Sequence, residues 1–277
     1  MQTIEFTKFH GFGNDYLVIR AEDLKAISNL GAFAQSICNR HKGVGADGIA
    51  VLEKSTDTES DFYCRIINPD GSEAGFSGNG TRCAVAYVYY SDTWSDSVLR
   101  LRTNSGVKRY EFLGCENNSF EFLSELGIPN SLQEMKKTLA GFEFEFPPIS
   151  LDVGNPVCAI FVSDFAAIEW RRIGAALESN TELFPQKTNV VFVKTIDRGN
   201  IEIRIWERGA AETSSSGTCS IAAAVAAVYT NRTEREVAVH AVGGTTSALW
   251  REDEKMLITG TAELAFSGEF PYATKHG

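Results

Sequence analysis

The stretch RIINPDGSEAGFSGNGTRCA, residues 65–84, returns in the second half of the chain as RIWERGAAETSSSGTCSIAA, residues 204–223. The two copies align without a gap, and Gly78 and Gly217, for example, lie 139 positions apart (217 − 78). In each copy a short apolar strand leads through a polar turn into an alanine-rich helix that is apolar on almost every side, which is typical of a protein interior. A repeat this long predicts two copies of one domain, because the repeats of a solenoid are far shorter.

The hydrophobic pattern of the rest of the chain predicts a mixture of strands and helices. We expect a first domain at residues 1–118, completed by residues 263–277, and a second domain at residues 119–262. Strands are expected at 4–10, 16–19, 49–53, 61–68, 98–103, 108–113, 149–153, 158–162, 191–195, 201–206, 236–242, 246–251 and 255–260, and helices at 30–40, 83–90, 132–139, 165–178 and 219–229.

The composition disfavours two classes of partner. The 277 residues include 26 lysines and arginines against 36 aspartates and glutamates, a net charge of −10. This balance disfavours a surface for nucleic acid or for anionic membranes, since both require a clustered basic face. We expect a small metabolite as the ligand. The six cysteines show no C-x-x-C spacing and are expected to be reduced and mostly buried. No signal-like start or bilayer-length apolar stretch is found, so we expect a soluble, cytoplasmic protein.

Residues 43–48, Gly-Val-Gly-Ala-Asp-Gly, match the G-x-G-x-x-G pattern of dinucleotide-binding proteins. That fingerprint must follow a strand and open a helix. Here the predicted helix comes first and the strand afterwards, so we reject a dinucleotide site. The glycines are instead expected to let the backbone approach a ligand or another strand.

A serine stands at the start of each repeated helix, Ser77 in the first copy and Ser216 in the second. Serine is a favoured N-cap, so capping alone explains either residue. A matched pair of proton donors and acceptors is also what a racemase or epimerase requires, because one group removes a proton from one face of a carbon while the other delivers one to the opposite face. The two helix N-termini would attract a carboxylate between them.

Several motifs, in the same order along the chain, carry a resemblance to a known family. They are residues 6–15 (FTKFHGFGND), 43–48 (GVGADG), 68–73 (NPDGSE), 78–80 (GNG), 154–156 (GNP), 188–190 (TNV), 206–209 (WERG) and 217–218 (GT). Together they resemble the diaminopimelate epimerase family over nearly the whole chain. The resemblance implies an α/β (α+β) fold with two pseudo-symmetric domains, each a curled, mostly antiparallel sheet or barrel around a central helix.

The resemblance also implies a reaction and a set of contacts. The reaction is the epimerisation of LL- and meso-diaminopimelate at Cα, in lysine and peptidoglycan precursor biosynthesis, with no cofactor and no metal. The substrate is a small diamino dicarboxylate, and a homodimer is compatible with the family. The implied substrate contacts are Asn14, Asn68, Gly78, Asn79, Asn155, Asn189, Glu207, Arg208, Gly217 and Thr218, and the implied catalytic positions are Ser77, Ser216 and Glu207. Arg208 can hold a carboxylate bidentately.

The chain departs from the family at its chemical centre. The two acid/base residues of the family are cysteines, whereas the matching positions here are Ser77 and Ser216, and the family histidine after Gly-Asn-Pro is Val157. A thiol ionises far more readily than an alkyl hydroxyl. Three interpretations stay open: deliberate replacement of both cysteines, a divergent epimerase whose serine is activated by Glu207 or another neighbour, or a chain that binds a diamino acid without turnover or acts as a racemase or dehydratase on another amino acid.

Overall fold

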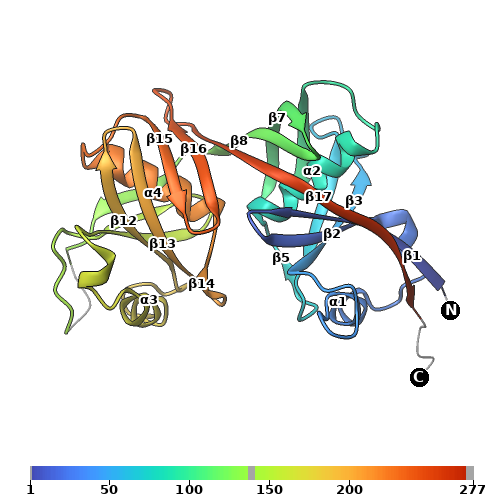
Figure 1. Cartoon of the computed structure of the whole chain (residues 1–277), viewed down its shortest axis with the longest axis horizontal. Coiled ribbons are helices and arrows are strands. Elements are labelled where there is room, and N and C mark those ends of the chain that lie inside the picture. The colour runs from blue at the N-terminus through green and yellow to red at the C-terminus, as the bar shows by residue number, and fades with distance from the viewer. Residues whose placement is uncertain (1, 137–140, 273–277) are drawn as a thin grey trace. The chain divides into compact units, whose positions relative to one another are not determined.

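The computed structural model describes residues 2–136 and 141–272, apart from the side chain of Gln2. The chain divides into two compact units (Figure 1). Unit 1 contains the chain up to residue 124 and from residue 260 onward, and unit 2 contains residues 125–259. Because strand β17 (Met256–Tyr272) begins in unit 2 and ends in unit 1, the end of the chain belongs to the same unit as its beginning.

Unit 1 contains a sheet whose strands pair in nearly the same order as they follow one another in the sequence. Besides the end of β17, unit 1 contains β1 (Gln2–Gly11), β2 (Asn14–Arg20), η1 (Ala21–Leu24), α1 (Leu30–Ile37), β3 (Gly48–Lys54), β4 (Phe62–Ile67), β5 (Glu73–Ala74), α2 (Gly78–Tyr90), β6 (Val98–Thr103), β7 (Gly106–Glu116) and the first part of β8 (Ser119–Gly127). Strands β2 and β3, and likewise β4 and β6, pair in parallel, while β1–β17, β1–β2, β3–β4 and β6–β7 pair antiparallel. Parallel neighbours need a crossover, and α1 and α2 supply the two crossovers.

The sheet of unit 1 curls back on itself. Asn117 and Asn118, between β7 and β8, have φ of 48° and 68°. Two successive residues with positive φ form the tight turn that matches the twist of a hairpin, and asparagine tolerates this conformation. Strand β8 in turn pairs with β17, and the Leu264 N–H donates to the Asn118 carbonyl at 3.0 Å.

Alternating side chains of the sheet pack on two different helices. Tyr16 and Val18 of β2 join the cluster around α2, while Leu17 and Ile19 join the cluster around α1. This follows from the two-residue period of a strand. Residues 83–86 of α2 are fully buried, so α2 is the central helix of unit 1.

Unit 2 repeats this plan. Its elements are β9 (Asn130–Glu134), β10 (Ile149–Asp152), β11 (Pro156–Phe161), η2 (Phe165–Ala167), α3 (Trp170–Glu178), β12 (Asn189–Asp197), β13 (Asn200–Glu207), β14 (Ala211–Thr213), α4 (Gly217–Tyr229), β15 (Glu236–Ala241), β16 (Gly244–Trp250) and the start of β17. Parallel pairs again bracket the helices, β11–β12 around α3 and β13–β15 around α4. Strand β9 pairs antiparallel with β10 in unit 2, and this pairing corresponds to that of β17 with β1 in unit 1. The predicted fold, two related α+β domains with curled, mostly antiparallel sheets around a central helix, is therefore confirmed.

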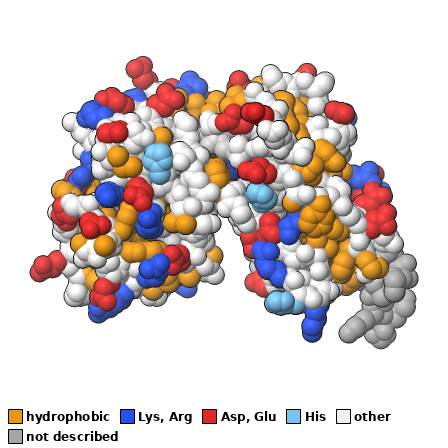
Figure 2. Space-filling model, in the orientation of Figure 1, with side chains coloured by type: hydrophobic (Ala, Val, Ile, Leu, Met, Phe, Trp, Pro, Cys, Tyr) orange, Lys and Arg blue, Asp and Glu red, His pale blue; other side chains and the backbone are white. Residues whose placement is uncertain are grey.

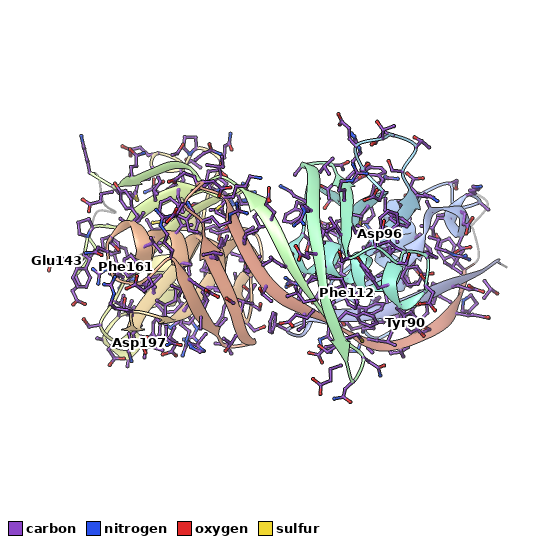
Figure 3. All side chains as sticks on the ribbon, turned by 90° about the horizontal axis from the view of Figure 1, so that it is seen from above. Tyr90, Asp96, Phe112, Glu143, Phe161 and Asp197 are labelled. Carbon is purple, nitrogen blue, oxygen red and sulfur yellow. The ribbon has the colours of Figure 1, made fainter. Side chains whose placement is uncertain are left out.

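Two aromatic contacts show how sheet and helix meet. Figure 3 labels Phe112 on β7 and Phe161 at the end of β11. Phe112 stacks on Tyr89 of α2 with ring centroids 4.4 Å apart. The guanidinium of Arg232, just after α4, lies 4.3 Å from the centroid of the Phe161 ring. In both units an aromatic ring on the sheet thus packs near the C-terminal end of the central helix.

One prediction about the chain was wrong, and another is confirmed at one of its glycines but not at Gly43. The helix expected at 132–139 is absent from its described part, because residues 130–134 form strand β9 and pair with β10; residues 137–140 lie outside the described range. The glycines of residues 43–48 do approach a strand at Gly48, where a Cβ would lie 3.0 Å from the Ile67 carbonyl oxygen of β4, whereas Gly43 approaches a helix. A Cβ there would lie 2.5 Å from the Ile37 carbonyl oxygen, at the end of α1.

The surface and the cysteines agree with the composition. Acidic and basic side chains are interspersed over the face shown in Figure 2. Five cysteines are buried and reduced, and Cys115 on β7 is reduced and exposed. In residues 2–136 and 141–272, none of the helices has both the length and the apolar character needed to cross a bilayer.

Candidate active site

Ser77 is the N-cap of α2. Its backbone is extended, with φ of −138°, and its Oγ accepts a hydrogen bond from the Gly80 N–H at 3.1 Å. The same Oγ lies 2.9 Å from the hydroxyl of Tyr16 on β2. Ser77 therefore serves as a cap, and its hydroxyl also has a phenol as a second partner.

Ser216 is the N-cap of α4 in the same conformation, with φ of −153°. Its Oγ accepts from the Cys219 N–H at 3.4 Å and donates to Oε1 of Glu207 at 2.6 Å. The Thr218 hydroxyl lies 3.3 Å away. Burial raises the pKa of Glu207, and the hydrogen bond from Ser216 opposes part of that rise. The two repeated serines thus share the cap geometry but differ in their second partner, which is a phenol for Ser77 and a carboxyl group for Ser216.

The turn that follows Glu207 is held from two sides. The Arg208 N–H donates to Asn189 Oδ1 at 2.9 Å, and the Gly209 N–H donates to Glu178 Oε1 at 3.1 Å. The other oxygen of Glu178 accepts from the Trp206 indole at 3.0 Å. The Arg208 guanidinium is exposed and donates once, to the carbonyl of residue 186 at 2.8 Å. An arginine has five N–H donors, so further donors can serve a bound anion.

A chain of amides connects the first turn of α2 to the β1–β2 turn. Asn79 Nδ2 donates to Asn14 Oδ1 at 3.2 Å, and Asn14 Nδ2 donates to Asp47 Oδ2 at 2.9 Å. The guanidinium of Arg82 donates to Asn79 Oδ1 from within the helix. Arg82 is 2% exposed, and burial lowers its pKa. These bonds fix the orientation of both asparagine side chains.

Asp15 binds two cationic side chains next to these asparagines. It accepts from two nitrogens of Arg40 at 2.7 and 3.1 Å and forms an ion pair with Lys8 at 2.7 Å. Arg40 also contacts Asp47 at 2.7 Å, which joins this cluster to Asn14. Burial alone would raise the pKa of Asp15, but the hydrogen bonds and charges of Arg40 and Lys8 outweigh it and lower the pKa to about 2.

This cluster leads to a prediction about stability. The pKa of Asp15 falls from an ordinary 3.8 to about 2 on folding, so the ionised group stabilises the fold above pH 3.8, and that contribution is lost as the pH falls through about 2. Asp15→Asn is expected to lower the free energy of unfolding at neutral pH by about 2 kcal/mol. Urea titrations measure it. Asp253→Asn, which breaks an exposed ion pair with Arg251, is the control and should cost less than about 1 kcal/mol. Equal losses for the two variants would contradict the role assigned to Asp15.

The predicted site residues fall into two groups. In unit 1 a hydrogen bond links Asn14 and Asn79 beside the helix start at Ser77 and Gly78; Asn68 instead donates to Ser72 Oγ at 2.9 Å. In unit 2 hydrogen bonds link the residues around the start of α4 and the end of β13, namely Ser216 with Glu207 and Thr218, and Asn189 with Arg208; Gly217 opens α4.

Asn155 is half-buried and lies in the turn between β10 and β11. Val157 is 1% exposed and stands in register with Asn189 on the parallel neighbour β12. An aliphatic side chain thus occupies a packed position at the edge of the second group.

Sequence reasoning missed four contributors, Tyr16, Asp47, Arg82 and Glu178. Arg82 left a signal, because it is a charged residue inside an otherwise apolar helix, and such a residue needs a buried partner. Tyr16, Asp47 and Glu178 gave no comparable signal. Their contacts to Ser77, Asn14 and Gly209 cross 61, 33 and 31 positions of sequence.

The class of fold is shared with several solved structures. A phenazine biosynthesis protein of the PhzF family from Bacillus anthracis superposes with a TM-score of 0.73 at 16% identity, over 98% of this chain and 100% of that one. A hydroxyproline epimerase from Agrobacterium vitis gives a TM-score of 0.69 at 14% identity, over 97% and 91%. At these identities the likeness defines the fold alone, a two-domain architecture found among epimerases.

Sequence comparison narrows this class to one family. The diaminopimelate epimerase of Pelotomaculum thermopropionicum is 36% identical over 98% of this chain and 100% of its own length. That of Caldanaerobacter subterraneus subsp. tengcongensis is 37% identical over 96% and 99%. The family profile described as diaminopimelate epimerase matches residues 6–123 and 149–265. The chain belongs to the diaminopimelate epimerase family.

Proposed function

We propose that this chain epimerises diaminopimelate at Cα, with Ser77 and Ser216 moving the proton on opposite faces of the carbon. Family membership supports the substrate and the reaction, because the similar proteins are named diaminopimelate epimerase. The local geometry supports the roles of the two serines, because each hydroxyl lies at the start of a central helix and has a more acidic partner.

The contact that carries this proposal is the 2.6 Å hydrogen bond from Ser216 to Glu207. An alkyl hydroxyl is too weak an acid to hold a negative charge for long at neutral pH. When Ser216 Oγ takes the α-proton, its own proton passes along the hydrogen bond to the Glu207 carboxylate, so the charge never rests on an alkoxide. Burial raises the pKa of Glu207, which makes this carboxylate a stronger base than an exposed one.

The same proposal assigns the binding contacts. The reacting carboxylate would accept hydrogen bonds from the first N–H groups of the helices, at Gly78 and Asn79 and at Gly217 and Thr218, since these groups lack partners within a helix. The distal end of the substrate would meet the side chains Asn14, Asn68, Asn155, Asn189 and Arg208. Support comes from the fixed orientations of Asn14 and of the Arg208 turn.

A second candidate is a binding protein that holds a diamino acid without turnover. The observation in its favour is that both serine hydroxyls already accept a helix N–H, as ordinary caps do. Calorimetry with LL-diaminopimelate, followed by proton NMR of the α-position in D2O, separates the two. Binding with loss of the α-proton signal supports the epimerase, and binding with a persistent α-proton signal supports the binding protein. Absence of binding would contradict both.

We infer that the protein acts in the cytoplasm on a free small molecule, without a nucleic-acid or membrane partner, and that it forms a homodimer. The net charge of −10 supports the absence of a nucleic-acid or anionic-membrane partner. Sedimentation equilibrium tests the homodimer, and a mass equal to that of a single chain at all concentrations would contradict it.

A further inference from the structure

We infer that Tyr16 is the proton relay partner of Ser77, as Glu207 is for Ser216. This inference rests on the proposed function for its use in catalysis, but the sharing of a proton between Tyr16 and Ser77 can be tested without substrate. The inference is based on the 2.9 Å contact between the two hydroxyl oxygens, in which either atom can be the donor.

The hydrogen bonds of Ser77 suit a proton relay. Its Oγ accepts the Gly80 N–H, which leaves one proton to donate and one lone pair to use. If Tyr16 donates into that lone pair, the Ser77 proton is free for a substrate carbanion. If Ser77 donates to a Tyr16 phenolate, the Ser77 lone pair is free to accept an α-proton. The same pair of hydroxyls therefore supports both directions of the reaction.

Two glycines leave space for the phenol ring of Tyr16. A Cβ on Gly48 would lie 2.7 Å from Tyr16 Cε1, and a Cβ on Gly80 would lie 2.8 Å from the same atom. Neither glycine has the positive φ that would itself call for glycine. Tyr16 is 6% exposed in the cluster around α2. Both glycines thus make room for the ring, and Gly80 also supplies the N–H that orients Ser77.

The relay balances protons and charge. When Ser77 acts as the acid, its O–H bond breaks and the proton joins the α-carbanion, while the Tyr16 O–H proton moves to Ser77 Oγ. The negative charge of the carbanion ends on the Tyr16 phenolate. A phenol has an ordinary pKa near 10 and is far more acidic than an alkyl hydroxyl. In the reverse direction the α-proton goes to Ser77 and the Ser77 proton goes to the phenolate.

Tyr110 offers a matched control, because it contacts the same helix as Tyr16. Tyr110 on β7 is 1% exposed and contacts the Thr81 hydroxyl at 2.7 Å. Tyr110→Phe removes a buried tyrosine hydroxyl that contacts α2, as Tyr16→Phe does, but it leaves the contacts of the Ser77 hydroxyl in place. The two variants therefore separate loss of a structural hydrogen bond from loss of the relay.

The first test follows exchange of the substrate α-proton in D2O. Tyr16→Phe is expected to slow exchange by about 10²-fold, in the range of general acid–base effects, and Tyr110→Phe to leave it unchanged. In a Ser77→Cys background the thiolate holds its own charge, so Tyr16→Phe should then have little effect. An equal effect of Tyr16→Phe with serine and with cysteine at position 77 would overturn the inference.

The second test needs no turnover, so its result does not depend on the proposed reaction. The tyrosinate absorbance of the full chain, minus that of Tyr16→Phe, gives the titration of Tyr16. Ser77→Ala removes the donor to the phenolate and should move this titration to higher pH, whereas Ser91→Ala, which removes a hydroxyl at the other end of α2, should not. An unmoved titration in Ser77→Ala would show that the two hydroxyls share no proton. A moved titration without any diaminopimelate exchange would refute the proposed reaction but retain the pair.

Discussion

Glu207→Gln is expected to slow exchange of the substrate α-proton by about 10²-fold or more. Glutamine keeps the shape of the side chain and can still accept a hydrogen bond from Ser216, but it cannot take up the Ser216 proton. The rate of deuterium incorporation into diaminopimelate measures the effect. Calorimetric affinity should change much less, because the variant alters proton transfer and leaves the side-chain contacts to the distal end in place.

Glu202→Gln is the control for this variant. Glu202 lies on the same strand, β13, is half-buried and forms an ion pair with Arg204 at 2.8 Å. Its replacement should leave the exchange rate unchanged.

Because burial raises the pKa of Glu207, the loss of exchange rate on acidification should begin at a higher pH than an exposed glutamate would give. An acid limb that survives unchanged in Glu207→Gln would contradict the assignment of Glu207 as the base.

Gly43→Ala is expected to lower the free energy of unfolding by about 3 kcal/mol. A Cβ there would come 2.5 Å from the Ile37 carbonyl oxygen and closer still to that of Ser36. Both obstacles are backbone atoms at the end of α1, so neither can rotate away. The backbone of the following turn must shift, and that turn holds the Val44 and Gly45 N–H bonds to Ile37, at 2.8 and 3.0 Å.

Urea titration measures this loss as a lower midpoint at an unchanged slope. Gly199→Ala is the matched control, because it lies in the β12–β13 turn with negative φ and a Cβ there would meet only Asp197 Oδ1, at 3.6 Å. Its free energy of unfolding should change by less than about 1 kcal/mol. If Gly43→Ala were as stable as Gly199→Ala, the close approach to α1 would not constrain the turn.

The sequence predicted the features that depend on local pattern or on the repeat. The gapless repeat placed both central helices and both capping serines, and it indicated two related domains. The apolar character of residues 83–86 predicted a buried helix correctly. The helix expected at 132–139 was wrong because strand β9 forms through its pairing with β10, which a local pattern cannot reveal.

Site partners that join distant segments were the hardest to predict. Glu207 lies only nine positions from Ser216 and was named from the family motif. The partner of Ser77 lies on β2, 61 positions away, and their contact depends on how α2 packs against the sheet. The repeat predicted equivalent serines, but it could not predict that one would face a phenol and the other a carboxyl group.

A single-turnover reaction of LL-diaminopimelate in D2O tests the central claim most directly. With separate donors and acceptors on the two faces, the first meso product should carry deuterium at the inverted carbon, while the remaining LL substrate keeps its protium. Mass spectrometry of the two separated stereoisomers measures this. A meso product that retains the original protium, or the absence of any meso product, would contradict the account.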